Sequence, residues 1–165
     1  GDAVGLYTFA SEQSRFIAPV KGAGQLKVLL NGVYDLDSTR RSADYTAAVN
    51  QLLIRQKRRA LVVLVTNVRD ESNEELLSAM TQLGKQHRVL IASLYEERLE
   101  DVRLTPVQSL TDALAYCATV DYLNGTARLH EQLRTHGVPI INARPSELGA
   151  ELVARYLAWK KSEVL

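Results

Sequence analysis

The stretch that decides the fold is Ala60-Leu61-Val62-Val63-Leu64-Val65-Thr66, which is apolar throughout and shows no alternation with polar residues. A strand that is covered on both faces of a parallel sheet has this composition. Downstream, Ser72 and Glu75 have capping-box spacing and begin a helical pattern that contains Leu76, Leu77, Met80 and Leu83, and residues 89–94 form a second apolar run. The pattern predicts a strand–helix–strand unit.

The C-terminal part repeats this order. Residues 110–133 are predicted to be helical, in one or two pieces with an interruption near Asn124-Gly125, and residues 138–142 form a short strand. Pro139 cannot donate to a ladder and places that strand at a sheet edge, while Pro145 suits the first turn of a final helix. Because strands and helices alternate after residue 60, we expect an α/β fold with an open, mostly parallel, doubly wound sheet.

The N-terminal part predicts a hairpin and two helices. Residues 3–10 and 15–18 are strand-like and flank a turn at residues 11–14. Apolar residues at helical spacing then mark one helix from Leu26 to about Asp35 and a second that begins near Tyr45 and ends at the basic run 55–59. A polar connection, residues 37–42, separates the two helices.

Composition narrows the classes of protein to consider. The chain has 165 residues, the usual size of one domain, with 46% hydrophobic residues and a net charge of +1. A net charge this close to zero gives no overall electrostatic attraction for nucleic acid. No apolar run approaches the roughly twenty residues of a membrane segment. Cys117 is the one cysteine, which excludes an internal disulfide, and its apolar helical surroundings predict a buried, inert thiol.

Candidate site residues lie where strands end, because parallel sheets bind ligands beyond their carboxyl ends. These positions are Ala10-Ser11, Thr66-Asn67, Tyr95-Glu96 and Asn142. With Asp70, the loop after Thr66 becomes rich in oxygen ligands suited to magnesium.

Two residues at the start of the preceding helix, Ser42 and Asp44, are candidates to join the same loop. An alternative reading is equally physical: Ser42, Asp44 and Ser72 are good helix N-caps, and Asp70 suits a turn. Both readings stay open on the residues alone.

Other chemistry is weakly indicated. His87, His130 and His136 are not spaced as metal ligands, and we expect them at the surface. The segment 22–24, Gly-Ala-Gly, lacks the third glycine and the preceding parallel strand of a nucleotide-binding loop. The basic run 55–59 has no interleaved aromatic residues and opposes the helix macrodipole.

Five segments carry a family resemblance: residues 1–10, 58–70, 87–91, 137–142 and 156–160. They resemble the bacterial family called domain of unknown function 58, whose members look like von Willebrand factor A domains and are commonly encoded beside MoxR-type AAA+ ATPases. The resemblance implies a von Willebrand factor A-like, Rossmann-like fold that lacks its first central strand and helix. Residues 1–165 would then be a single, N-terminally truncated domain.

The resemblance also implies a metal-ion-dependent adhesion site, in which magnesium binds a partner's carboxylate. The family's Asp-x-Ser-x-Ser strand is absent, and Asn67 stands where the family has aspartate. We therefore expect a degenerate site with Thr66, Asp70 and Asp44 as candidate ligands and with Ser42, Asn67 and Glu96 in an interaction loop. No cofactor is expected in this chain, and magnesium is expected only in a full-length protein.

The resulting functional expectation is a non-enzymatic protein-interaction module, as an adaptor or partner of a MoxR-type ATPase. The alternatives are the soluble structural part of a membrane-anchored cell-envelope protein and a nucleotide- or flavin-binding α/β enzyme. The expected location is cytoplasmic, or tethered to a membrane through upstream segments. A missing central strand would leave edges at residues 3–10 and 60–66. We expect these edges either to pair directly or to pair in a second copy of the chain.

Overall fold

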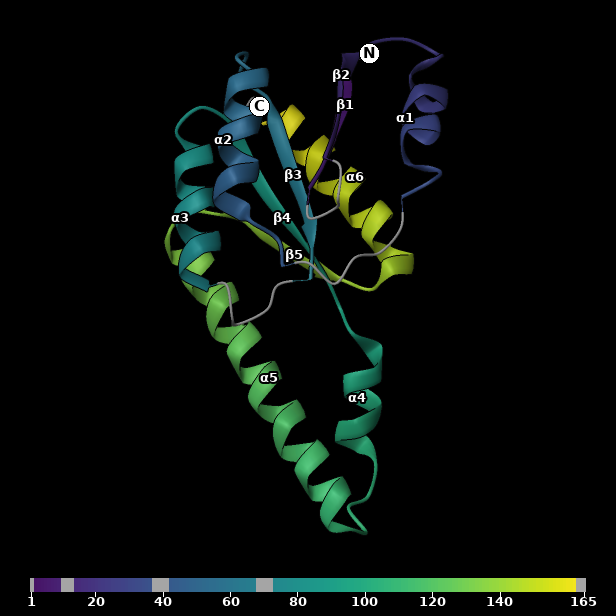
Figure 1. The fold of residues 1–165 in the computed structure, drawn as a ribbon, viewed down its shortest axis with the longest axis vertical. Coiled ribbons are helices and arrows are strands. Elements are labelled where there is room, and N and C mark those ends of the chain that lie inside the picture. The colour runs from purple at the N-terminus through teal and green to yellow at the C-terminus, as the bar shows by residue number, and fades with distance from the viewer. Residues whose placement is uncertain (1, 10–13, 37–41, 68–72, 163–165) are drawn as a thin grey trace. The chain divides into compact units, whose positions relative to one another are not determined.

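The structure is a computed structural model that describes residues 2–9, 14–36, 42–67 and 73–162. These residues form two compact units, residues 1–55 and residues 56–165 (Figure 1). The single domain expected over residues 1–165 stays a prediction.

The second unit contains a three-stranded parallel sheet with the order β3-β4-β5. Its strands are β3 (Leu61–Thr66), β4 (Arg88–Leu94) and β5 (Ile140–Ala143). Four helices complete this unit: α3 (Asn73–Gly84), α4 (Glu97–Leu104), α5 (Leu110–Thr135) and α6 (Pro145–Lys161). The predicted α/β class with parallel strands is confirmed.

Helices cover both faces of this sheet. In β4, Leu90 and Ala92 pack in one cluster with Leu148 of α6. Side chains alternate between the two faces of a strand, so Val89 and Ile91 point to the opposite face, where α3 and α5 contact the sheet and each other (Figure 1). The largest fully buried side chains come from α3, β4 and α5: Leu76, Met80, Leu83, Leu90, Ile91, Leu129 and Leu133.

Several expectations for this unit need correction. Strand β3 is not covered on both faces: Val63 and Val65 are 37% and 52% exposed, and β3 lies at the sheet edge. Helix α4 was not expected, because its mostly charged sequence carries no apolar stripe. Helix α5 continues without interruption through residues 124–125.

Three surface expectations are also wrong. His87 and His130 are buried, at 4% and 7% exposure, and the thiol of Cys117 is exposed. Cys117 lies on the part of α5 that precedes its first buried residue, Thr119. The edge position of β5, predicted from Pro139, is confirmed.

The first unit holds the expected hairpin and helices. Strands β1 (Val4–Thr8) and β2 (Arg15–Val20) pair antiparallel and are followed by α1 (Gln25–Val33) and α2 (Tyr45–Arg55). Most of the predicted hairpin turn lies outside the described residues.

Side chains connect β2 to the C-terminal ends of α1 and α2. The Arg15 guanidinium binds the Asp35 carboxylate and donates to the Gly32 carbonyl oxygen at 3.1 Å, which fixes β2 to the end of α1. The Arg55 guanidinium lies 5.3 Å from the ring centroid of Phe16.

Strand β1 pairs with β2, and β3 pairs with β4. Direct pairing of residues 3–10 with residues 60–66 stays a prediction. Closure through a second copy stays a prediction. None of the helices in the described ranges is long and apolar enough to cross a bilayer.

Candidate functional site

A polar row crosses the parallel sheet at its carboxyl edge. Thr66 lies opposite Ser93, and Ser93 lies opposite Asn142. The preceding row on the same face is the buried apolar set Leu64, Ile91 and Ile140. This face therefore changes from apolar to polar side chains within two residues, because side chains two positions apart share a face. Within the polar row Ser93 is buried, Thr66 is half-buried and Asn142 is exposed.

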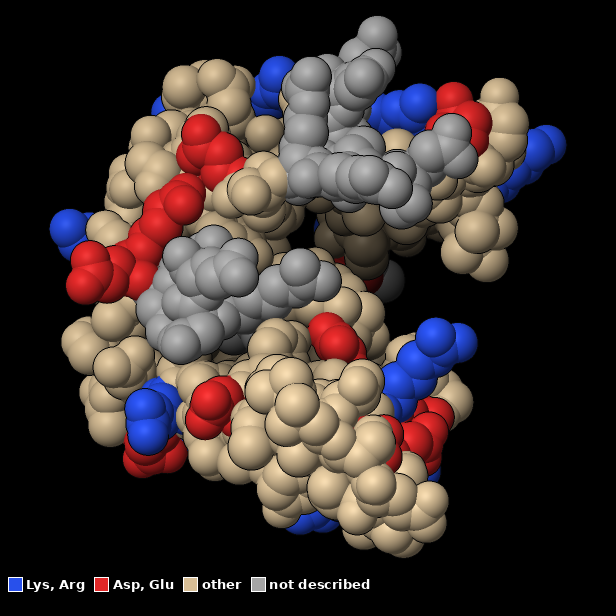
Figure 2. Space-filling model, turned by 60° about the horizontal axis from the view of Figure 1, so that its bottom comes forward, with Lys and Arg blue, Asp and Glu red and all other residues tan. Residues whose placement is uncertain are grey.

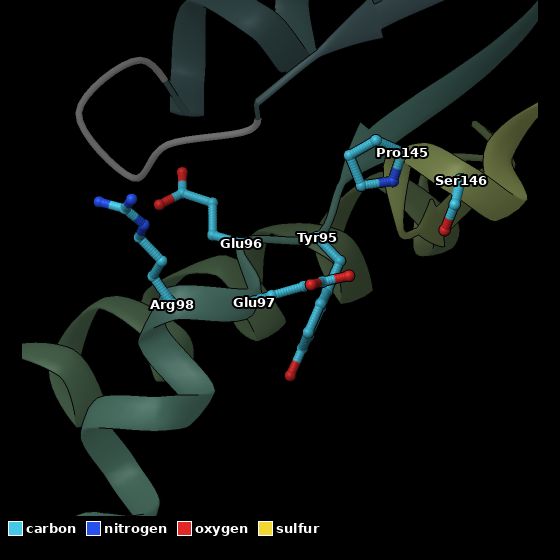
Figure 3. Close-up of a pocket in the computed structure, with 6 residues that line it drawn as sticks. All are labelled: Tyr95, Glu96, Glu97, Arg98, Pro145 and Ser146. Carbon is cyan, nitrogen blue, oxygen red and sulfur yellow. The ribbon is translucent and has the colours of Figure 1, made fainter.

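An open cleft of about 570 Å³ lies at the same edge, where β4 passes into α4 and α6 begins. Figure 3 shows its lining residues, Tyr95, Glu96, Glu97, Arg98, Pro145 and Ser146. Glu96 and Arg98 extend to one side, while Tyr95 and Glu97 extend to the other, with Pro145 and Ser146 on the start of α6 (Figure 3).

Local hydrogen bonds position the β4 side of the cleft. The Tyr95 amide donates to the Ala143 carbonyl oxygen at 2.9 Å, which extends the β4–β5 pairing one residue beyond β4. The next residue, Glu96, occupies the N-cap position of α4, and its Oε1 accepts from the Tyr122 hydroxyl of α5 at 3.1 Å. Strand pairing and α5 together fix the Tyr95-Glu96 segment.

An ion pair joins the starts of α4 and α6. Arg144 Nε lies 3.5 Å from Glu97 Oε1, and both side chains are more than half exposed. Such a pair contributes at most about 1 kcal/mol, because water screens it. It orients the rim of the cleft more than it stabilises the fold.

A second carboxylate, Glu100, organises Tyr95 and Arg103. The Tyr95 hydroxyl donates to Glu100 Oε2 at 3.1 Å, and Arg103 Nε donates to the same oxygen at 3.2 Å. The hydrogen bond from Arg103 lowers the pKa of Glu100, whereas burial, followed by the bond to Glu100, raises the pKa of Tyr95. At neutral pH the pair is therefore a neutral phenol that donates to an ionised carboxylate.

The sequence profile of the family Protein of unknown function DUF58 matches residues 1–128. The chain belongs to this family. Comparison with curated proteins and with solved structures gave no match.

The predicted site residues of this DUF58 chain fall in both units. Asp44 Oδ1 accepts from the Ala47 amide at 2.7 Å, so Asp44 caps α2, as the alternative reading expected. Ser42, also in the first unit, is exposed ahead of α2. In the second unit Thr66 ends β3 and Asn67 follows it, exposed.

The described oxygen ligands at the end of β3 do not by themselves form a site that fits magnesium. Thr66 and Asn67 offer uncharged oxygens, and divalent cations in proteins are usually held by carboxylates. Asp70 lies outside the described residues. Within the ranges that the structure describes, no three histidine, cysteine, aspartate or glutamate side chains gather as a metal site.

Sequence reasoning found part of the cleft. Tyr95 and Glu96 were expected at a strand end and do line it. Arg98 and Ser146 were missed, because Arg98 lies on the unexpected helix α4 and Ser146 shows no motif. Pro145 was expected at the start of the last helix, and this expectation was the feature of the sequence that indicated the α6 side of the cleft.

Proposed function

We propose that this DUF58 chain is a protein-interaction module without catalytic activity of its own, and that it binds a partner at the carboxyl edge of β3, β4 and β5. One observation carries this proposal: the row Thr66, Ser93 and Asn142 and the cleft beside Tyr95 and Glu96 lie at the same edge. A shallow polar edge beside an open cleft offers hydrogen bonds and shape to a partner.

The finer proposal is that the partner is a MoxR-type AAA+ ATPase and that the chain acts as its adaptor through a von Willebrand factor A-like edge. Its support is the resemblance of residues 58–70 and 137–142 to DUF58 proteins encoded beside such ATPases. In a full-length protein, Asp70 and Asp44 would be candidate ligands that add carboxylate charge to Thr66. Magnesium there would bind a partner carboxylate.

A nucleotide- or flavin-binding function is the second candidate, because the cleft lies where parallel sheets bind such ligands. The carboxylates of Glu96 and Glu97 on its rim oppose a phosphate group. A rise in melting temperature with ATP or flavin mononucleotide would favour this candidate over the interaction module.

Affinity capture from a bacterial lysate tests the proposed function. The chain is immobilised with magnesium or with chelator, and bound proteins are identified by mass. We expect recovery of an AAA+ ATPase, and loss in chelator would assign the contact to the loops that contain Asp70 and Asp44. Absence of any AAA+ ATPase would contradict the adaptor role.

A pair of variants locates the contact. Asn142→Arg places a bulky cation at Asn142, the exposed member of the polar row, and we expect it to abolish capture. The control is Gln132→Arg, a similar change at an exposed position near the end of α5. The end of α5 leads into the start of β5, so Gln132 lies toward the amino ends of the strands, opposite the carboxyl edge. Equal capture by both variants would remove the carboxyl edge from the proposal.

A further inference from the structure

Helix α4 and the first half of α5 form an arm that extends away from the parallel sheet (Figure 1). We call residues 97–118 the α4–α5 arm. Helix α4 has no buried residue, and the buried residues of α5 begin only at Thr119. The arm thus has two helices in contact but no buried side chain of its own.

Large aliphatic side chains gather at the end of this arm. Leu104, Val107, Leu110 and Leu114 are 70%, 52%, 77% and 63% exposed, and they come from the end of α4, the connection and the start of α5. Leu110, Leu114 and Cys117 have i, i+4 and i+7 spacing, which puts them on one face of α5. Apolar side chains that gather in this way, rather than singly, mark an interaction surface.

The arm and its base are acidic although the whole chain has a net charge of +1. Residues 96–121 contain six carboxylates and two arginines, a net charge of −4. Asp101 is exposed one helical turn before Leu104 of the apolar tip, and Asp121 is exposed on α5 toward the base of the arm. Figure 2, in which the lower end of Figure 1 is turned forward, shows an uncharged surface with both acidic and basic groups around it.

This charge decides between occupants of the tip. Residues 97–118 alone carry four carboxylates and two arginines, a net charge of −2. An anionic bilayer would therefore repel the arm, and a second copy would bring more negative charge to the same place. A helix with one apolar face and flanking lysines or arginines would cover Leu110 and Leu114 and neutralise the carboxylates. We propose that the tip of the α4–α5 arm is a docking site for a cationic amphipathic helix of a partner protein.

The inference rests on the proposed role as an interaction module, but it uses a surface other than the carboxyl edge. The arm tip and the polar row can therefore be disabled separately. The Asn142→Arg variant should lose ATPase capture and keep binding at the tip. Variants of the tip should lose binding of the helix whether or not the partner is an ATPase.

The test uses a synthetic helical peptide of leucine and lysine at 3.6-residue spacing, with a second peptide that has glutamate in place of every lysine. Binding of each fluorescein-labelled peptide to the chain is followed by anisotropy. The rate at which a maleimide alkylates Cys117, the one cysteine and exposed on the arm, reports where the peptide binds. We expect the lysine peptide to bind at least about tenfold more tightly and to slow the alkylation.

The paired variants are Leu110→Ser with Leu114→Ser at the tip, and Val153→Ser with Leu157→Ser on α6, where the side chains are 57% and 49% exposed. We expect the tip pair to weaken the lysine peptide by about tenfold or more and the α6 pair to leave it unchanged. Circular dichroism confirms that both pairs fold, since exposed substitutions cost little stability.

Several results would overturn the proposal. These are equal affinity for the two peptides, equal affinity of the tip and α6 variants, unchanged alkylation of Cys117, or no binding of the lysine peptide up to about 1 mM. Two further results would assign the tip to another occupant. One is sedimentation with phosphatidylglycerol vesicles that the tip variant loses, and the other is a concentration-dependent dimer that the tip variant loses.

Discussion

The buried histidine at the start of β4 gives the sharpest test of the fold. Both ring nitrogens of His87 are buried without a hydrogen-bond partner among the described residues, and the side chain is 4% exposed. Burial lowers the pKa of His87, and the neighbouring backbone of Gln56 opposes that shift only in part. His87 is therefore neutral in the folded chain at neutral pH.

The sign of the pH dependence follows from this shift. Below the ordinary histidine pKa of about 6.5, the unfolded chain binds a proton that the folded chain resists. Stability is therefore full above pH 6.5 and falls as the pH drops toward the lowered pKa of the folded state. The slope from His87 is at most about 1.4 kcal/mol per pH unit.

Replacing His87 by leucine removes both the proton linkage and the unpaired nitrogens while keeping an apolar side chain in the core. We expect His87→Leu to raise the free energy of unfolding by about 1–3 kcal/mol at pH 7.5, because a buried unpaired polar group costs about that much. For a chain of this size, each kcal/mol raises the melting temperature by about 2–4 °C. The gain should grow at pH 5.5.

Urea denaturation at pH 7.5, 6.5 and 5.5 measures these differences. The control is His136→Leu at an exposed histidine, which should change the free energy of unfolding by less than about 0.5 kcal/mol at pH 7.5. A His87→Leu chain that is less stable than wild type at both extremes, or that has the wild-type slope below pH 6.5, would refute the reasoning.

Three further pairs of substitutions test the two units. Leu148→Ala, in the cluster against β4, should cost about 2–4 kcal/mol in urea denaturation, whereas Leu157→Ala, 49% exposed on the same helix, should cost under about 0.5 kcal/mol; similar losses would contradict the core assignment. Gly5→Ala should lower the melting temperature, because a Cβ at this position would lie 2.7 Å from a carbonyl oxygen of β2. Gly149→Ala on α6, where a Cβ meets nothing within 4 Å, should raise the free energy of unfolding by about 0.5–1 kcal/mol. Asp44→Ala should lower the free energy of unfolding by about 1 kcal/mol through loss of the α2 cap, and Asp44→Asn should lower it much less. Equal losses from the two changes would argue against capping. A loss of magnesium affinity in either variant, measured by calorimetry, would identify Asp44 as a metal ligand as well.

The sequence by itself determined the elements that have a strong period or composition. The apolar runs at residues 60–66 and 89–94, the prolines at 139 and 145, and the helical spacing around Tyr45 each describe a local preference. The elements that they predicted appear close to where they were expected. Tyr95 and Glu96 were found for the same reason, since the end of a strand is visible in the chain.

Only the tertiary structure decided which of these elements are covered. Val63 and Val65 have the composition of buried residues, yet they lie on an edge strand and are exposed, because burial depends on the neighbour and not on the residue. His87 and His130 are polar yet enclosed, and Cys117 is apolar in context yet exposed, for the same reason. The cleft joins residues about fifty positions apart, and the arm exists because α4 and α5 lie side by side beyond the sheet. Such surfaces arise from the arrangement of elements, which no local pattern specifies.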